Sequence, residues 1–254
     1  MASSKPTIFF SPGGFHTPWI YDTVRRILSN RGFATEASYL VSVGTTDASV
    51  GMLSDAKHLR SLLTKTIDEG KEVVVVAHSY GGVIVSNAVD GLSVAQRAAE
   101  GKQGGILMIL YLAALIIPAG KNFWAIVNPN SVPWDDTGDG FLVPKNPIHS
   151  FYADVEAPLA SKAANALKPM SSQVLIDEST YEPWNQGFEV GYIFTEEDNT
   201  LVIDAQKVMF SHFPDGSFSA SLASGHSPFL NIPDALADTI QDGVDYVLKK
   251  GLST

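Results

Sequence analysis

Ser79 stands where an apolar strand is expected to end and a helix to begin, in the stretch AHSYG. Four valines at positions 73–76 precede it, and Gly81 and Gly82 follow it. The general G-x-S-x-G pattern places a nucleophilic serine on a sharp strand-to-helix turn, where bulky neighbours would collide. Here Ala77 replaces the first glycine. A serine that only caps the helix would fit the same window, so more distant residues have to distinguish the two interpretations.

A nucleophilic serine needs a base, and His226 is the best placed of the six histidines. It follows the last expected strand, in ASGHSPFLNIPDAL, and precedes the last expected helix. An acid that would orient this histidine is expected in FTEEDNT, which offers Glu196, Glu197 and Asp198 in a row. The chain order of serine, acid and histidine is the one expected when three such loops converge at one sheet edge. Position alone leaves the choice among the three carboxylates open.

Acyl transfer also needs hydrogen-bond donors for the developing oxyanion. One is expected to be the N–H of the residue after the nucleophile, Tyr80, and the other to come from the loop SPGGFHTPW after the first strand. Gly13 and Gly14 would let the backbone of that loop approach a ligand closely. These features together predict nucleophilic catalysis through an acyl-enzyme, with no metal and no cofactor.

The elements that would position these residues follow a regular rhythm of apolar runs and helical patterns. Strands are expected over residues 7–10, 34–41, 73–77, 106–112, 189–194 and 217–223. Helices are expected over residues 19–30, 54–69, 80–89, 158–168 and 202–212, and a last one has an apolar stripe from 232 to 244. This alternation predicts an α/β fold, with a mostly parallel sheet covered by helices on both faces. The proposed catalytic loops would then share the carboxyl edge of the sheet.

Residues 121–187 interrupt the rhythm with prolines and aromatics, and they show no convincing strand. We interpret them as a small helical cap, inserted after the fourth expected strand of a single domain that spans residues 1–254. Substrate contacts are expected from Phe15 and His16 in the first loop and from Trp124 in the cap. Small-molecule pockets are mostly apolar, so the aromatics predict a medium-sized, largely apolar substrate.

The composition excludes several other classes of protein. Hydrophobic residues make up 45% and charged residues 17%, which is typical of a globular chain and not of disorder. The net charge of -10 argues against nucleic acid as a partner. The absence of cysteine excludes disulfides and thiolate metal sites. No signal peptide or membrane span is evident, which predicts a cytoplasmic location. We expect a monomer or homodimer that acts on a small molecule.

The sequence resembles the α/β-hydrolase superfamily, and more closely the small single-domain group that includes plant methylesterases and hydroxynitrile lyases. The resemblance covers nearly the whole chain in four blocks, PGGFHTPWIYDTV, VVVVAHSYGGVIVSNAV, YIFTEEDNTLVIDAQ and ASGHSPFLNIPDALA. Pro12 departs from the histidine usual in the first block. The third block, with Gln206 at the family's spacing, implies Asp198 as the acid. The resemblance also implies Gly14 and Tyr80 as the oxyanion donors.

The branch within this group decides the expected reaction. Hydroxynitrile lyases of this type carry a lysine after the catalytic histidine and a threonine in the first loop, whereas this chain has Ser227 and Gly13. Both departures favour hydrolysis of an ester or lactone over cleavage of a cyanohydrin. Two alternatives stay open: a carbon–carbon lyase or hydrolase that uses the same triad, and a small-molecule receptor with little turnover.

Overall fold

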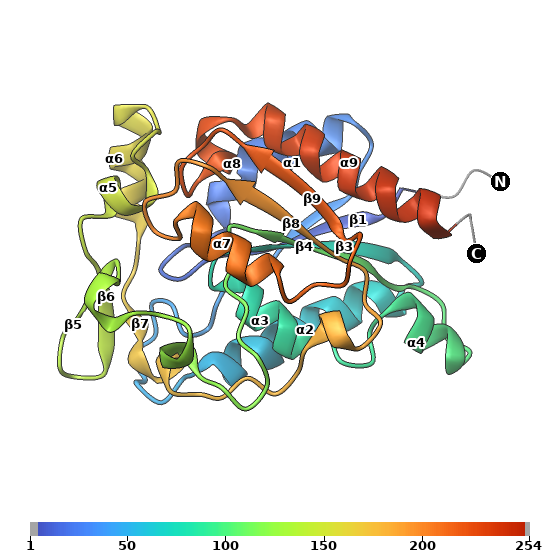
Figure 1. Ribbon diagram of the computed structural model, residues 1–254, viewed down its shortest axis with the longest axis horizontal. Helices are drawn as coiled ribbons and strands as arrows, with labels where there is room; N and C mark the ends of the chain where they lie inside the picture. The colour runs from blue at the N-terminus through green and yellow to red at the C-terminus, as the bar shows by residue number, and fades with distance from the viewer. Residues whose placement is uncertain (1–4, 252–254) are drawn as a thin grey trace.

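The central sheet of this computed structural model, which describes residues 5–251, has six parallel strands in the order β2-β1-β3-β4-β8-β9 (Figure 1). Their bounds are β1 (Thr7–Ser11), β2 (Thr35–Ala37), β3 (Glu72–His78), β4 (Gly105–Leu112), β8 (Val190–Thr195) and β9 (Phe218–Leu222). The expected parallel sheet is therefore confirmed. The second strand is shorter than the eight residues expected for it.

Helices cover both faces of the sheet, as Figure 1 shows. One face carries α1 (Asp22–Asn30), the turn η1 (Pro18–Tyr21), α8 (Pro228–Asn231) and α9 (Pro233–Gly251). The other carries α2 (Met52–Asp68), α3 (Gly81–Ala88) and α7 (Ile203–Phe210), with α4 (Val94–Ala99) beside them. None of the helices in residues 5–251 is long and apolar enough to cross a membrane.

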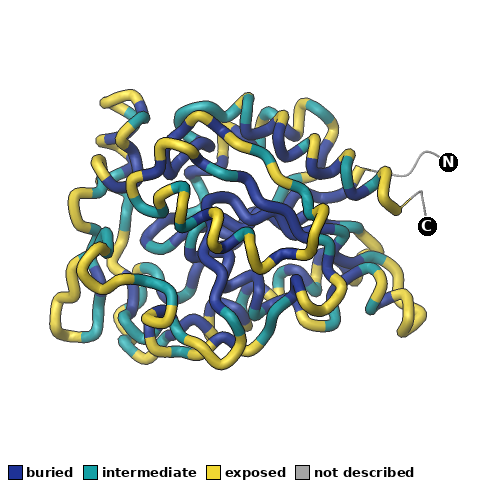
Figure 2. The backbone as a smooth tube through the Cα atoms, viewed as in Figure 1, coloured by how far each residue is buried: buried dark blue, intermediate teal, exposed yellow. Residues whose placement is uncertain are grey.

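Burial on both faces explains why β3 is apolar at every position from Val73 to Ala77. Val73, Val75 and Ala77 pack into the core on the α2 and α3 side. Val74 and Val76 pack into the core on the α1 and α9 side. Because successive side chains of a strand point to opposite faces, a strand buried on both faces has no polar alternation. The strands at the centre of the molecule are accordingly buried throughout (Figure 2).

The helix α4 was missed in the sequence, although it carries a signal. The Ser93 hydroxyl accepts a hydrogen bond from the Gln96 N–H at 3.1 Å, and the Gln96 side chain accepts one from the Ser93 N–H at 3.2 Å. This reciprocal pair is a capping box, which marks a helix N-terminus. Six residues are too few to show a helical period, so only the cap could have revealed the helix.

Much of the segment 121–187 lies at the end of the molecule toward which β8 and β9 point, and its last part runs back past α3 toward α4 (Figure 1). The segment forms α5 (Pro147–Phe151), α6 (Ala157–Ala166) and the single turns η2 (Phe123–Ala125), η3 (Pro129–Ser131), η4 (Ser172–Leu175) and η5 (Pro183–Asn185). The expectation that this segment contains no strand is wrong. An antiparallel sheet joins β5 (Trp134–Asp136), β6 (Phe141–Pro144) and β7 (Met170–Ser171). Strands this short cannot display an alternating pattern.

Candidate active site

Ser79 occupies a strained turn directly after β3. Its φ of 53° lies in the left-handed region, which residues other than glycine rarely adopt. The turn is fixed because the Ser79 carbonyl accepts hydrogen bonds from the N–H groups of Gly82 and Leu115, both at 3.0 Å. A Cβ atom at Gly81 would lie 2.6 Å from the Ser11 carbonyl oxygen. The small residues around Ser79 are therefore required by the close approach of neighbouring backbone.

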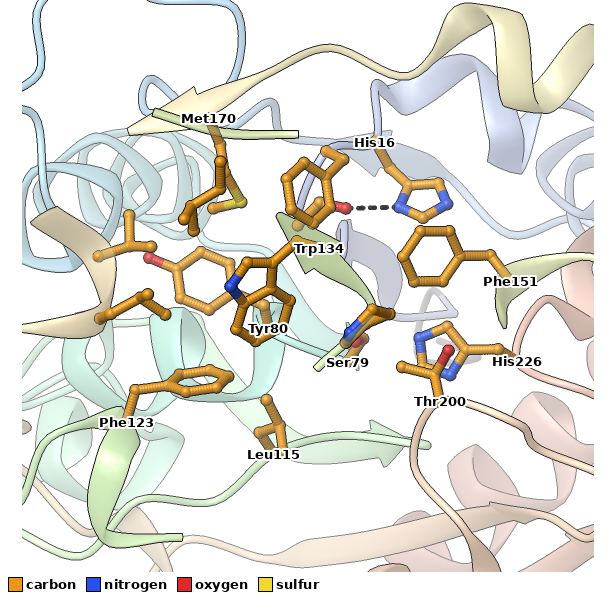
Figure 3. Close-up of a pocket in the computed structure, with 16 residues that line it drawn as sticks. His16, Ser79, Tyr80, Leu115, Phe123, Trp134, Phe151, Met170, Thr200 and His226 are labelled. Carbon is orange, nitrogen blue, oxygen red and sulfur yellow. Dashed lines mark hydrogen bonds between the residues drawn. The ribbon is translucent and has the colours of Figure 1, made fainter. Parts of the chain in front are cut away.

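His226 and Asp198 are joined by a buried hydrogen bond. The distance between His226 Nδ1 and Asp198 Oδ2 is 2.7 Å, and the two residues are 2% and 4% exposed. Because a carboxylate accepts, Nδ1 carries the proton in this pair. The ring of His226 lies next to Ser79 in the same cavity (Figure 3). The loops after β3, β8 and β9 thus bring a hydroxyl, a carboxylate and an imidazole together.

Only one carboxylate of the acidic run enters this arrangement. Asp198 Oδ1 accepts hydrogen bonds from the N–H groups of Thr200 at 2.7 Å and Leu201 at 2.9 Å. Its Oδ2 accepts a third from the Thr195 hydroxyl at 2.9 Å, in addition to the bond from the histidine. Glu196 and Glu197 are exposed instead. The turn that follows β8 therefore directs a single carboxylate inward.

Gln206 holds that turn from the helix α7. Its side-chain oxygen accepts from the Thr195 N–H at 2.9 Å. Its side-chain nitrogen donates to the carbonyl oxygens of Thr195 at 2.9 Å and Leu201 at 2.7 Å. The side chain is fully buried. The glutamine singled out by its spacing therefore acts at the two ends of the turn that carries Asp198.

Two main-chain donors face the same cavity. Gly14 and Tyr80 both line it. Within the described residues 5–251, no protein acceptor pairs with the N–H of either residue. The Gly14 carbonyl is held by the His16 ring, whose Nδ1 donates to it at 2.7 Å (dashed line in Figure 3). Phe15, between them, has a φ of 68°. This loop thus leaves the Gly14 N–H without a described protein acceptor at the cavity that Ser79 also lines.

The cavity above Ser79 is mostly apolar. Its walls enclose about 500 Å³ of space when the part open to solvent is included. The residues that line it come from the loops after β1, β3, β8 and β9, from Leu115 after β4, and from residues 121–187 (Figure 3). The apolar ones are Phe15, Leu115, Phe123, Pro133, Trp134, Leu142, Phe151, Met170, Val174 and Leu175.

Of the three residues expected to contact the substrate, two line the cavity and one does not. Phe15 and His16 line the cavity. Trp124 does not, because its side chain turns away and is 42% exposed. Its neighbour Phe123 lies in the cavity instead and packs against Trp134, with ring centroids 5.6 Å apart. Within a single turn such as η2, the sequence does not show which of two adjacent aromatics points inward.

Two further histidines near the site are neutral. Burial lowers the pKa of His16 to about 4. Burial, followed by the nearby His226, lowers the pKa of His78 well below its ordinary value. His78 Nε2 lies 2.9 Å from the carbonyl oxygen of His226 and donates to it. His78, next to the candidate nucleophile in sequence, therefore supports the loop that carries His226.

Sequence reasoning missed the carboxyl group of Asp55 on α2. Its Oδ2 accepts from the Tyr80 hydroxyl at 3.3 Å and from the Ser42 hydroxyl at 2.6 Å, and its Oδ1 accepts from the Ser42 N–H at 2.9 Å. Burial raises the pKa of Asp55 to about 6. No local motif marks this residue, because its partners come from two other segments of the chain.

Comparison with known proteins gives a consistent result. The model of the family described as "Alpha/beta hydrolase family" matches residues 8–239. The alpha/beta hydrolase nvfD of Aspergillus novofumigatus is 22% identical over 244 residues, which cover 94% of this chain and 96% of that protein. The probable hydrolase R7 of a Phoma species is 24% identical over 255 residues, covering 94% and 98%.

Solved structures share the fold at low identity. A pyrethroid hydrolase from Sphingobium faniae JZ-2 superposes with a TM-score of 0.75 at 20% identity, covering 94% of this chain and 97% of that one. The methylesterase MES16 from Arabidopsis superposes with a TM-score of 0.73 at 21% identity, covering 94% of this chain and 99% of that one. Tomato methylketone synthase I, in complex with 2-tridecanone, superposes with a TM-score of 0.74 at 14% identity, covering 95% of this chain and 99% of that one.

Proposed function

The chain belongs to the alpha/beta hydrolase family, as its resemblance predicted, and on this premise we propose that it is a serine hydrolase. Its substrate would be a carboxylic ester or lactone of a medium-sized, largely apolar small molecule. The observation that carries the proposal is the convergence of Ser79, the His226–Asp198 pair and two unpaired N–H groups on one cavity. Nucleophile, base, orienting acid and oxyanion donors are the set that acyl transfer needs.

The proposed reaction begins when the Ser79 hydroxyl attacks the substrate carbonyl and His226 Nε2 takes its proton. Asp198 holds the imidazole in the tautomer that leaves Nε2 free, and stabilises the imidazolium that forms. The N–H groups of Gly14 and Tyr80 bind the oxyanion of the tetrahedral intermediate, and each such donor is typically worth about 100- to 1000-fold in rate. His226 then protonates the leaving alkoxide, and an acyl-enzyme remains on Ser79.

In the second half of the cycle, a water molecule replaces the alcohol. His226 takes a proton from that water, which attacks the acyl carbonyl within the same oxyanion site. The acid leaves, and the Ser79 hydroxyl is regenerated. For a lactone, the alcohol and the acid are parts of one molecule, so a single open-chain product is released. Water is the only co-reactant of the whole cycle.

Substrate size and polarity follow from the cavity wall. We propose that residues 121–187 act as the cap that covers the reacting bond, because Phe123, Trp134 and Phe151 from this segment line the cavity. An apolar wall favours uncharged substrate groups, since burying a charge without a partner is costly. Aliphatic side chains in the same wall, Leu115 and Met170 among them, extend this preference.

The residue at position 13 supports hydrolysis over cyanohydrin cleavage. A Cβ atom at Gly13 would lie 3.0 Å from Ser79 Cβ and 3.0 Å from His78 Nδ1. The threonine that lyases of this group carry in this loop would therefore press on the nucleophile. Ser227, which stands where those lyases carry lysine, is fully buried and uncharged. Among the described residues that line the cavity there is no lysine or arginine that could stabilise a departing cyanide.

Labelling with a fluorophosphonate tests the proposal directly. We expect covalent attachment at Ser79, located by peptide mass spectrometry, together with hydrolysis of a panel of neutral esters and lactones. Ser79→Ala should abolish both labelling and turnover, whereas Ser61→Ala, which changes an exposed serine on α2, should affect neither. Wild-type protein that resists the probe and leaves every ester intact would reject the serine-hydrolase assignment.

A further inference from the structure

One short part of the cap touches all three loops that surround Ser79. Residues 149–154 run from the end of α5 into the following turn, and we refer to them as the bridging segment. The loops in question are the oxyanion loop (residues 12–16), the acid loop (residues 195–201) and the histidine loop (residues 223–231). The contacts are hydrogen bonds to specific atoms. In each loop, at least one of them reaches a residue within two positions of a proposed catalytic group.

The acid loop is bound through two carbonyl oxygens of the bridging segment. The Thr200 hydroxyl donates to the Ser150 carbonyl at 2.6 Å. The side-chain amide of Asn199 donates to the His149 carbonyl at 3.1 Å. Thr200 is also the residue whose N–H binds Asp198 Oδ1 at 2.7 Å. The same threonine therefore connects the cap to the carboxylate that holds His226.

The oxyanion loop is bound through Tyr152. The Tyr152 hydroxyl lies 2.8 Å from His16 Nε2, and His16 Nδ1 lies 2.7 Å from the Gly14 carbonyl. A carbonyl can only accept, so Nδ1 carries a proton. In the neutral ring Nε2 is then the acceptor, and the tyrosine donates. The pKa of His16, lowered by burial to about 4, agrees with a neutral ring that has a free lone pair. Both ring nitrogens of His16 are thus engaged within the protein.

The histidine loop is bound through Asp154. A single oxygen, Oδ2, accepts from the Gly225 N–H at 2.6 Å, the Ser224 hydroxyl at 2.9 Å and the Asn231 amide at 2.7 Å. Gly225 immediately precedes His226 in the chain. The other oxygen of Asp154 is buried and has no partner among the described residues. Phe151 completes the contact, because its ring lies 5.8 Å from that of His226 and 5.5 Å from that of His16.

We propose that the bridging segment holds the acid, histidine and oxyanion loops in register, and that Tyr152 and Asp154 are positioning residues for the reaction. This inference rests on the proposed function, since it assigns a role within that site. Neither residue lines the cavity, so neither is expected to touch the substrate. Misplacing a reacting group by about 1 Å can cost about 100-fold in rate, which gives such contacts a purpose beyond packing the cap.

Three variants and two matched controls test the proposal on the full chain. Asp154→Ala removes three hydrogen bonds to the histidine loop, whereas in Asp154→Asn an amide oxygen can still accept all three. Tyr152→Phe removes only the donor to His16. The matched controls are Asp47→Ala, whose carboxylate bonds to Ser49 within its own exposed loop, and Tyr181→Phe, whose hydroxyl bonds to Gln96.

The measurements are the fluorophosphonate labelling rate at Ser79, kcat, KM for one neutral ester, and Tm. We expect Asp154→Ala and Tyr152→Phe to lower both the labelling rate and kcat by about tenfold or more, the size of effect produced by about 1.4 kcal/mol of transition-state energy. KM should change by less than about threefold, because the cavity wall is intact. Asp154→Asn should recover most of the rate, and both controls should resemble the wild type.

A structural role alone would give a different pattern. Tm would fall, and the folded fraction of each variant would label and turn over at the wild-type rate, which would overturn the inference. Equal losses in Asp154→Ala and Asp154→Asn would also contradict it, because then the hydrogen bonds would not be the cause. Failure of the proposed function is recognisable separately: in that case the wild-type protein itself would not be labelled at Ser79.

Discussion

At the scale of single residues, Asp198 offers a test that separates charge from shape. Asp198→Asn keeps the size of the side chain and an oxygen for the N–H groups of Thr200 and Leu201. Its amide nitrogen would then face His226 Nδ1 and favour the wrong tautomer of the ring. We expect kcat to fall by about 10⁴-fold with little change in KM.

The control for Asp198 is already present in the acidic run. Glu197→Gln removes a negative charge one residue away, on an exposed side chain. It should leave kcat within about twofold of the wild-type value, since exposed charges are strongly screened. Steady-state kinetics of both variants on the same ester decides the matter, and comparable losses would mean that Asp198 has no special role.

Asp55 gives a prediction about stability and pH. Burial raises its pKa in the folded protein to about 6, compared with an ordinary value of 3.8. The folded state therefore binds this proton more tightly than the unfolded state does. The resulting stabilisation is fully present below about pH 3.8 and is lost as the pH rises through about 6. The difference between the two pKa values corresponds to a loss of about 3 kcal/mol in the free energy of unfolding as the pH rises across this window.

Asp55→Asn removes this titration. As the pH rises from 4 to 7, the wild type loses this stabilisation and the variant does not. The unfolding free energy of the variant minus that of the wild type should therefore increase by about 3 kcal/mol. Urea unfolding of both proteins at intermediate pH values measures the difference. Asp242→Asn, which changes an exposed carboxylate on α9, should show no such trend. A constant difference between wild type and Asp55→Asn at all pH values would show that Asp55 does not titrate in this range.

At the scale of elements, α7 stabilises the end of β8 through one side chain. Gln206→Met keeps the volume but leaves the Thr195 N–H and the carbonyls of Thr195 and Leu201 without their partner. Unpaired buried groups cost about 1–3 kcal/mol each, and partial rearrangement reduces the sum. We expect a loss of about 3 kcal/mol in urea unfolding and a lower kcat.

The neighbouring residue on the same helix provides the comparison. Lys207→Met changes an exposed side chain whose ion pair with Asp204 spans 3.7 Å at the surface. Surface pairs contribute about 0–1 kcal/mol, so stability and kcat should remain close to those of the wild type. If Gln206→Met were equally harmless, the helix would not be the support of the acid loop.

At the scale of the whole molecule, the net charge and the apolar cavity both disfavour an anionic substrate. The chain carries a net charge of -10. None of the described residues that line the cavity is a lysine or an arginine. An anionic substrate would be repelled over a long range, and it would lose its hydration in the cavity without gaining a partner.

A matched pair of substrates measures this preference. We expect kcat/KM for mono-p-nitrophenyl adipate to be about 100-fold or more below that for p-nitrophenyl hexanoate, which has the same acyl chain without the carboxylate. Added salt should recover only a small part of the difference, because screening acts on the long-range repulsion and not on desolvation. Similar kcat/KM values for the two esters would show that the acyl group does not enter the apolar cavity.

The sequence by itself determined the sheet and the order of the catalytic loops. Every predicted strand outside residues 121–187 exists. The central strands β1, β3, β4 and β8 were recognisable because a strand buried on both faces is apolar over enough consecutive residues to be seen. The turn at Ser79 was recognisable for a similar reason, since close backbone contacts admit only small neighbours such as Gly81. These are local properties, and a short window of residues contains them completely.

Tertiary structure alone decided which side chains meet. It brought Asp198, which only the family resemblance had singled out from Glu196 and Glu197, to His226 at 2.7 Å. It placed Phe123 in the cavity instead of Trp124, and it built the small sheet of the cap from strands too short to show a pattern. It also joined Tyr152 to His16 across 136 positions of the chain. Such contacts depend on how loops pack once the sheet has formed, and residue spacing does not encode that.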